Sequence, residues 1–275
     1  MKAILTYHSV DETGSVISID ERTFRRHARW LASGRVRVVP LDVLPSLRDD
    51  VDAIAITFDD GLESFGRIAA PVLLDHDLPV TLFVVSDAVG TTNVWRGQRD
   101  AGIPVFPLLG WDALGRLVAD GVSIGAHTRT HLDLTSADAD TATREIVESR
   151  ARLARELGVD VSTFAYPYGG VGIAARDVVA REFRYGVTTR LAVLSPQNDP
   201  ALLPRLDSYY LRAAGSLESW GTARFRMRMG LLAGARSVRG SLSRSFARRR
   251  PIIRTSRSSF QSRMGTWCCR ACSKC

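Results

Sequence analysis

Cysteine is missing from almost the whole of this 275-residue chain, because Cys268, Cys269, Cys272 and Cys275 all fall in its last eight residues. The rest of the chain therefore has no disulfide and no thiol nucleophile, which agrees with a reducing compartment. The terminal cysteines have a spacing compatible with zinc, but no second ligand pair lies at the usual distance. An unstructured end is the favoured interpretation.

Acidic residues are absent after Glu218, whereas residues 219–275 carry 13 arginines and one lysine. Residues 1–218 hold 23 basic and 29 acidic side chains, so the formal net charge of +8 comes from the tail alone. The basic balance is therefore no argument that the body binds nucleic acid, and no specific nucleic acid is expected. For the tail, a weak electrostatic contact with an anionic membrane or an acidic polymer is the functional alternative to a disordered extension.

Long apolar runs are also lacking: none approaches the ~18 residues of a transmembrane helix. The first residues lead directly into a strand pattern without the apolar segment of a signal peptide, so we expect a cytoplasmic protein. The length suits one large α/β domain or two small ones. We expect a catalytic domain over residues 1–215 and a basic, disordered tail over residues 216–275.

The pattern along the body is an alternation of apolar strands and amphipathic helices, which predicts parallel strands in an α/β fold. Helices are expected between most of the strands, and residues 86–109 form a loop long enough to cover a substrate. Strands are expected over residues 2–7, 36–39, 53–58, 79–85, 122–126, 163–166, 185–188 and 202–206.

The strand over residues 53–58 ends in Asp59, Asp60 and Gly61. Neighbouring side chains on an extended chain point in opposite directions, so the two carboxylates need not do the same work. Taken alone, the pattern is more typical of a strand followed by a turn, because Asp and Gly are turn residues.

A second motif favours a functional interpretation. His127 and His131 follow the strand over residues 122–126, and two imidazoles with a carboxylate from another strand end suit a divalent metal with open coordination positions. Functional sites in such folds form at the carboxyl ends of the strands. Further polar or aromatic candidates fall at or just past strand ends, namely His8, Pro167, Tyr168 and Asp207.

Three ordered motifs resemble those of the polysaccharide deacetylases, the NodB-type domain of carbohydrate esterase family 4. They are residues 57–61 (TFDDG), His127-x3-His131 and residues 164–169 (FAYPYG), and residues 6–10 (TYHSV) are similar to the start of many bacterial members. The resemblance covers about residues 1–212. It implies a distorted (β/α)7 barrel, which agrees with the alternation of strands and helices.

The resemblance also implies a role for each matching residue. Asp60, His127 and His131 would bind one divalent metal, with Zn²⁺ expected and Co²⁺, Ni²⁺ or Mn²⁺ as alternatives. Asp59 would be the general base that takes a proton from the attacking water, and the backbone N–H of Tyr168 would stabilise the oxyanion.

The sequence departs from the family pattern at two places. The third motif usually begins with an arginine that orients the base, but Ala165 stands there, and Arg205 is either its replacement or a surface salt-bridge residue. The family's late histidine, the usual general acid, is missing because no histidine follows His131. His8 is a candidate for that role, and a hydrogen-bonded wall residue is the alternative.

Four functions remain open at this point. The first is metal-dependent removal of N-acetyl groups from an N-acetylhexosamine-containing glycan or oligosaccharide, with release of acetate. The others are an amidohydrolase of small cyclic amides, a non-catalytic glycan-binding relative, and nucleic-acid binding by the tail. The glycan, its length and its linkage cannot be predicted from the sequence.

Overall fold

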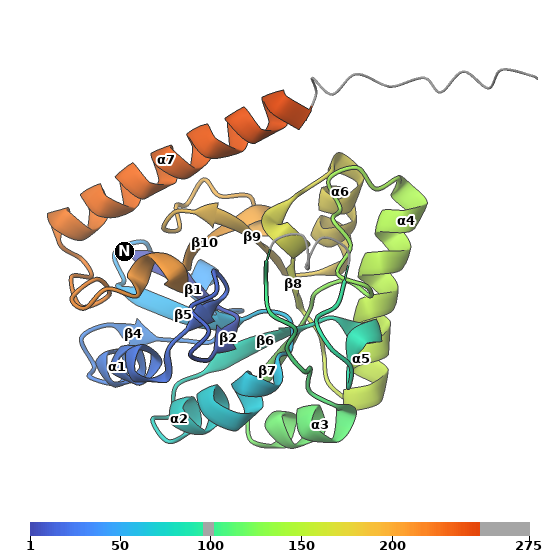
Figure 1. Ribbon diagram of the computed structural model, residues 1–275, viewed down its shortest axis with the longest axis horizontal. Helices are drawn as coiled ribbons and strands as arrows, with labels where there is room; N and C mark the ends of the chain where they lie inside the picture. The colour runs from blue at the N-terminus through green and yellow to red at the C-terminus, as the bar shows by residue number, and fades with distance from the viewer. Residues whose placement is uncertain (96–101, 248–275) are drawn as a thin grey trace, which may run out of the picture. The chain divides into compact units, whose positions relative to one another are not determined.

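The computed structural model describes residues 1–95 and 102–247, with side chains up to Arg236. Strands occupy the centre of the molecule and helices lie around them (Figure 1). The cysteine cluster and the end of the basic tail, on which the sequence analysis made predictions, lie outside the described residues.

Seven parallel strands form a closed barrel. Their order around the barrel is β1, β10, β9, β8, β7, β6, β5, and β5 pairs with β1 again to close it. Leu5 of β1 marks the closure, because it pairs with Ile56 of β5 and with Leu206 of β10. The barrel strands are β1 (Lys2–Tyr7), β5 (Ala53–Phe58), β6 (Val80–Val84), β7 (Ser123–Ala126), β8 (Thr163–Ala165), β9 (Tyr185–Leu191) and β10 (Leu203–Asp207). The predicted (β/α)7 barrel is thereby confirmed.

Three shorter strands lie outside this closed set. The short β4 (Arg37–Val38) pairs with β5 beside the barrel, and β2 (Ser9–Val10) pairs with β3 (Ser18–Ile19) in a small separate sheet. Both strands of the small sheet lie in the connection between β1 and the first helix, which starts at the carboxyl edge of the barrel.

Three ends of the barrel helices have residues with clear capping roles. The side chain of Asp20 accepts a hydrogen bond from the Thr23 N–H at the start of α1, and that of Asp138 accepts one from the Thr141 N–H at the start of α4. Gly158 ends α5 in a left-handed conformation. The helices are α1 (Glu21–Leu31), α2 (Ala70–Leu74), α3 (Trp111–Ala119), α4 (Ala139–Thr143), α5 (Ser149–Leu157) and α6 (Ile173–Glu182).

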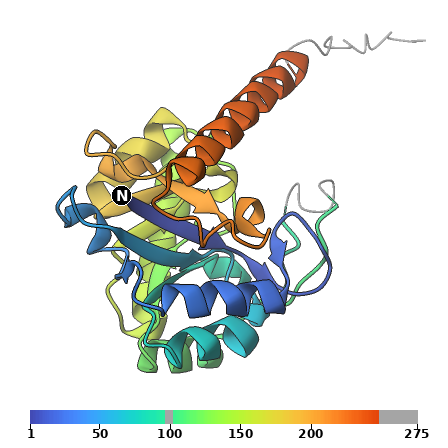
Figure 2. The same cartoon turned by 90° about the vertical axis from the view of Figure 1, so that its left-hand side faces the viewer.

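Two of these helices contain a π-helical turn, in which the hydrogen bonds span five residues instead of four. One turn, η2 (Phe65–Ala69), runs directly into α2, and the other, η4 (Arg144–Glu148), joins α4 to α5. Single 3₁₀ turns occupy several connections, namely η1 (Leu44–Ser46), η3 (Ser86–Ala88), η5 (Pro167–Gly169), η6 (Pro200–Leu202) and η7 (Ser208–Leu211). Figure 2 shows α1 in blue and α2 in teal lying side by side next to strands β1 and β5.

The core has two layers because successive strand residues face opposite sides of the sheet. Small and branched residues from strands across the barrel, such as Ile4, Ala55 and Leu203, meet in one cluster, which fills the barrel interior. Their neighbours in sequence, such as Ile54 and Phe58, pack outward against the helices. Along β5 this alternation points Ala55, and with it Thr57 and Asp59, toward the interior.

The compact unit of the chain runs to Ala235, about twenty residues past the expected boundary near residue 215. Leu217, Trp220, Phe225 and Met229 are buried in its core. The last two lie one turn apart on α7 (Ala223–Ala247), a helix that the sequence analysis did not anticipate. The weak apolar periodicity and the glycines of this segment argued against a helix in the sequence. Its first turns are nevertheless stabilised by the burial of Phe225 and Met229. We therefore propose a domain boundary near residue 235.

A buried hydrogen-bonded chain joins α1 to the segment that precedes α7. The hydroxyl of Tyr7 lies 3.1 Å from His27 Nδ1, and His27 Nε2 lies 3.1 Å from the carbonyl oxygen of Leu211. Burial lowers the pKa of His27 to about 4, so the ring is neutral at neutral pH. A neutral ring satisfies both contacts when Nε2–H donates to Leu211 and Nδ1 accepts from Tyr7. His27 is therefore a structural residue.

Among the described parts of the chain, no helix has both the length and the apolar content needed to cross a bilayer.

We predict that Phe225 contributes to the stability of the folded chain, whereas Leu231 does not. Phe225 is fully buried and Leu231 is 70 % exposed on the same helix. Phe225→Ala should lower the free energy of unfolding by about 3–5 kcal/mol, because it leaves a cavity in the core. Leu231→Ala, the matched control, should change it by less than about 0.5 kcal/mol. Urea unfolding of both variants checks this, and equal stabilities would mean that α7 is not part of the folded unit.

Candidate active site

The predicted site residues meet at the carboxyl edge of the barrel. His8 follows β1, Asp59 and Asp60 follow β5, and His127 follows β7. Because all barrel strands are parallel, their ends lie at one edge of the sheet, and the side chains that follow them converge there. This convergence was the main structural expectation from the sequence.

Asp60, His127 and His131 form one compact group. One carboxylate oxygen of Asp60, Oδ1, lies 3.4 Å from Nε2 of His127 and 3.4 Å from Nε2 of His131. One potential ligand atom from each residue lies within 4.8 Å of the others, and all three side chains are buried. The spacing and donor types are those of a metal site with three protein ligands.

The hydrogen bonds around this group also fit a cation. The Nδ1 atom of His127 lies 2.7 Å from the Ala165 carbonyl oxygen, which can only accept, so Nδ1 carries the hydrogen. In the neutral ring, Nε2 then directs its lone pair toward Asp60. Among the described residues, Asp60 Oδ1 has no hydrogen-bond partner although it is buried. Lone pairs that converge without a proton between them suit a metal ion, and the Ala165 carbonyl orients the ligand ring.

Electrostatics in this group depend on burial and on the neighbouring charges. Burial raises the pKa of Asp60, but the adjacent imidazoles outweigh it and hold that pKa well below its usual range. Burial alone lowers the pKa of both histidines. For His127 the carboxylates of Asp60 and Asp59 outweigh burial, so its pKa is raised. For His131 burial prevails, so its pKa is lowered. Asp60 is therefore ionised at neutral pH.

The backbone at the site is strained. Five non-glycine residues in the described chain have a left-handed φ, and four of them lie here: Asp60, Thr128, His131 and Tyr168, with φ of 75°, 61°, 60° and 57°. Each such residue costs about 1–3 kcal/mol unless its surroundings hold it in place. The strain is thus concentrated where the ligand side chains must turn toward a common point.

Asp59 is paired with Arg205 inside the barrel. The guanidinium Nη1 and Nη2 atoms of Arg205 donate to Asp59 Oδ1 and Oδ2, both at 2.6 Å, in a bidentate arrangement. Arg205 is 1 % exposed, and its Nε atom donates to the Thr188 carbonyl oxygen at 2.9 Å. The alternative of a surface salt bridge is therefore wrong, and Arg205 reaches Asp59 directly.

This pairing determines the charge of Asp59. Burial raises its pKa, but the positive charge and the two hydrogen bonds of Arg205 outweigh burial and hold the pKa below its usual range. The Nε2 atom of His8 lies 3.7 Å from Asp59 Oδ2, and its side chain is 20 % exposed. An ionised carboxylate thus sits between a fixed guanidinium and an imidazole that is open to solvent.

The remaining predicted residues occupy the rim or lie beyond it. The ring of Tyr168 meets His131 edge-on, with centroids 4.7 Å apart. Burial, together with Asp60 and Asp133, raises the pKa of the Tyr168 phenol to about 12. Pro167 is buried in the same 3₁₀ turn. Asp207, at the end of β10, caps the turn η7: its Oδ1 accepts a hydrogen bond from the Tyr209 N–H.

Trp95 is a site residue that the sequence analysis did not name. Its ring stacks on His131 with centroids 4.2 Å apart and planes at 22°. It belongs to the long loop after β6, and an aromatic residue in such a loop was the one signal available. A cavity of about 780 Å³ opens beside it. The cavity is lined by Val94, Trp95, Thr130, His131, Leu132, Asp133, Ser136 and Tyr168.

Comparison with known proteins gives the family. A sequence model of the polysaccharide deacetylase family matches residues 47–188, just over half of the chain. The chain therefore belongs to the polysaccharide deacetylase family. This assignment agrees with the resemblance found in the three motifs.

Individual relatives have low sequence identity to this chain. YxkH, a Bacillus subtilis (strain 168) protein named as a polysaccharide deacetylase homologue, is 23% identical over 192 residues, which cover 68% of this chain and 63% of YxkH. The chain thus spans less than two thirds of the length of that relative. The structure of IcaB from Ammonifex degensii superposes with a TM-score of 0.65 at 26% identity, covering 76% of this chain and 93% of IcaB. The Streptococcus pyogenes deacetylase PplD, solved in complex with acetate, gives 0.63 at 22%, covering 74% and 91%.

We predict that His131→Ala loses a divalent metal while the barrel stays folded. The change removes one of three ligands, whereas Asp59→Asn, the control at the same edge, leaves all three in place. Elemental analysis of the purified proteins, with circular dichroism as a check on folding, measures the outcome. Full metal occupancy in His131→Ala, or its loss in Asp59→Asn, would require the ligand assignment to be revised.

Proposed function

We propose that this chain hydrolyses N-acetyl groups of an N-acetylhexosamine-containing glycan or oligosaccharide and releases acetate, with one bound divalent metal. The observation that carries the proposal is the pair of adjacent carboxylates with separate partners. Asp60 faces two imidazoles, and Asp59 is held by a buried arginine. Amide hydrolysis needs an activated water and a base beside it, and this arrangement offers a residue for each requirement.

Asp60, His127 and His131 would hold the metal, for which two imidazoles and one carboxylate favour Zn²⁺, with Co²⁺, Ni²⁺ or Mn²⁺ as alternatives. When bound there, such an ion supplies Lewis acidity to a carbonyl oxygen and lowers the pKa of a coordinated water.

Asp59 acts as the general base in this proposal. Its low pKa keeps it ionised, and the bidentate contact with Arg205 fixes the plane of the carboxylate. Each carboxylate oxygen has two acceptor positions, so the contact with Arg205 leaves capacity for a water proton. Arg205 is a positioning residue here, and it performs from β10 the orienting task that the family gives to an arginine at the position of Ala165.

Asp59 takes a proton from the water, and the amine needs a proton as its bond to the carbonyl carbon breaks; we assign the donor of that proton to His8. Its imidazole Nε2 lies 3.7 Å from Asp59 Oδ2, and the side chain is partly exposed. We assign the oxyanion donor to the backbone N–H of Tyr168, in line with the family motif. The contact between the Tyr168 ring and His131 keeps that peptide next to the ligand group.

The cavity beside His131 supports a sugar as the substrate. A pyranose ring has an apolar face and a polar rim, and aromatic or aliphatic walls combined with a few polar groups recognise such a shape. Trp95, Leu132 and Tyr168 offer the walls, whereas Thr130, Asp133 and Ser136 offer polar groups. PplD is a deacetylase with the same fold, and its structure in complex with acetate agrees with acetate as a product.

We predict that the purified chain releases acetate from a chitin oligomer and that a chelator abolishes the release. Asp59→Asn should lower the rate on the order of 10²–10⁴-fold, since the base is lost while all three ligands remain. The measurement is enzymatic detection of free acetate, extended to a panel of acetylated glycans. His8→Phe, assayed in parallel, should show a comparable loss if the imidazole is the proton donor.

Other results would favour other functions. Glycan binding without acetate release would indicate a non-catalytic relative, and release only from small cyclic amides would indicate the amidohydrolase. Acetate release that survives complete metal removal would contradict the proposed mechanism.

We predict that Arg205→Met moves the acid limb of the pH–rate profile to higher pH. The base must be ionised, and Arg205 lowers the pKa of Asp59, so removing the guanidinium raises this pKa and activity is lost earlier as pH falls. Arg205→Lys, the control, keeps the charge without the planar fork and should give an intermediate profile. An unchanged acid limb in Arg205→Met with normal metal content would remove Arg205 from the mechanism.

A further inference from the structure

The two histidine ligands are joined by a loop of three residues, 128–130, whose shape decides where both imidazoles point. Thr128 at its start and His131 just after it have the strained left-handed φ described above. A loop in that shape needs contacts that hold its main chain. We propose that Glu145 is the positioning residue of this loop and thereby sets the affinity for the metal; the inference rests on the metal site of the proposed function.

Glu145 binds the loop through its main-chain donors. Its Oε2 atom accepts hydrogen bonds from the backbone N–H groups of Arg129 and Thr130, both at 3.0 Å. Its Oε1 atom accepts one from the Thr130 hydroxyl at 2.9 Å. The main-chain carbonyl oxygen of Glu145 also accepts from the Arg129 N–H, at 3.1 Å. One residue thus engages two consecutive peptides between the two ligands.

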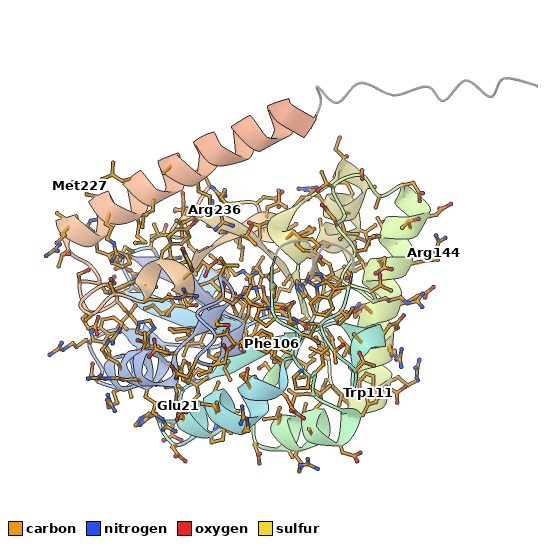
Figure 3. The ribbon with its side chains drawn as sticks, in the orientation of Figure 1. Glu21, Phe106, Trp111, Arg144, Met227 and Arg236 are labelled. Carbon is orange, nitrogen blue, oxygen red and sulfur yellow. The ribbon has the colours of Figure 1, made fainter. Side chains whose placement is uncertain are left out.

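The helix that carries Glu145 is adapted to this contact. Glu145 lies in the π-helical turn η4, between α4 and α5. A π turn widens the helix and displaces its carbonyl groups from the regular ladder, which allows one of them to accept from outside. Arg144, the preceding residue, points away from the body of the molecule (Figure 3). Glu145, the next residue along the turn, faces the loop, because its carboxylate accepts the hydrogen bonds from Arg129 and Thr130.

Other contacts steady the loop, but they use its carbonyl groups or a side chain. The hydroxyl of Ser149 donates to the Thr128 carbonyl oxygen at 3.0 Å, and the Asp87 N–H donates to the Arg129 carbonyl oxygen at 2.9 Å. Glu148, in the same π turn, accepts from the Arg129 guanidinium at 2.6 Å and is 53 % exposed. Glu148 is therefore a matched control: it is an acidic residue on the same turn that contacts the same loop without binding its main chain.

The test is Co²⁺ affinity of the full chain, measured by competition with a chromophoric chelator, together with the visible absorption of bound Co²⁺. Glu145→Ala should raise the dissociation constant about 10–100-fold and alter the absorption spectrum, as expected when an outer contact of a ligand is lost. Glu145→Gln keeps an oxygen acceptor at the same reach and should restore most of the affinity. Glu148→Ala should bind like the wild type.

Metal affinity and the Co²⁺ spectrum distinguish this role from a general contribution to folding. If Glu145 contributed only to folding, Glu145→Ala would lower the melting temperature of the metal-free protein but leave the metal affinity and the spectrum unchanged. Wild-type affinity and spectrum in Glu145→Ala would overturn the inference. If Glu145→Ala fails to fold, Glu145→Asp replaces it, because the shorter side chain keeps the charge but cannot reach the loop. Wild-type affinity in Glu145→Asp would then overturn the inference. Absence of Co²⁺ binding by the wild-type chain would overturn the metal site itself, and the inference with it.

Discussion

The burial of two adjacent carboxylates at the end of one strand is the constraint on which the site depends. Buried ionised groups are costly unless each is paired, and two of them side by side also repel each other. The chain separates them by strand geometry: Asp59 continues the inward-facing set of β5, and Asp60 turns away in a left-handed conformation. Each carboxylate then finds its own positive or polar partners, Arg205 for Asp59 and the two imidazoles for Asp60.

This separation explains why two neighbouring residues of the same type, Asp59 and Asp60, are suited to different roles. The contacts of Asp59 with Arg205 hold it in one orientation inside the barrel, where its oxygens can exchange protons but are not shared with the histidines. Asp60 Oδ1 has no hydrogen-bond donor within the described residues and is directed at two nitrogen atoms. The first environment suits a base and the second suits a ligand, and the difference originates in one reversal of side-chain direction between neighbouring residues.

The sequence predicted the elements that depend on local pattern. The bounds of β1 and β5 agree with the expected ones to the residue, because these segments are uninterrupted buried strands. The meeting of Asp60 with both histidines followed from parallel topology. What could not be predicted are contacts that depend on distant packing. Examples are the stacking of Trp95 on His131 and the burial of Phe225.

Arg205 shows why a missing motif residue need not mean a missing function. Inward-facing positions from all strands of a small barrel converge on its axis, so a guanidinium can approach the same carboxylate from more than one strand. Ala165 on β8 belongs to the interior cluster that includes Phe83, and the Arg205 guanidinium carbon lies 5.8 Å from the centre of the Phe83 ring. In this chain the positive charge beside Asp59 comes from β10, whereas Ala165 on β8 is small and supplies none.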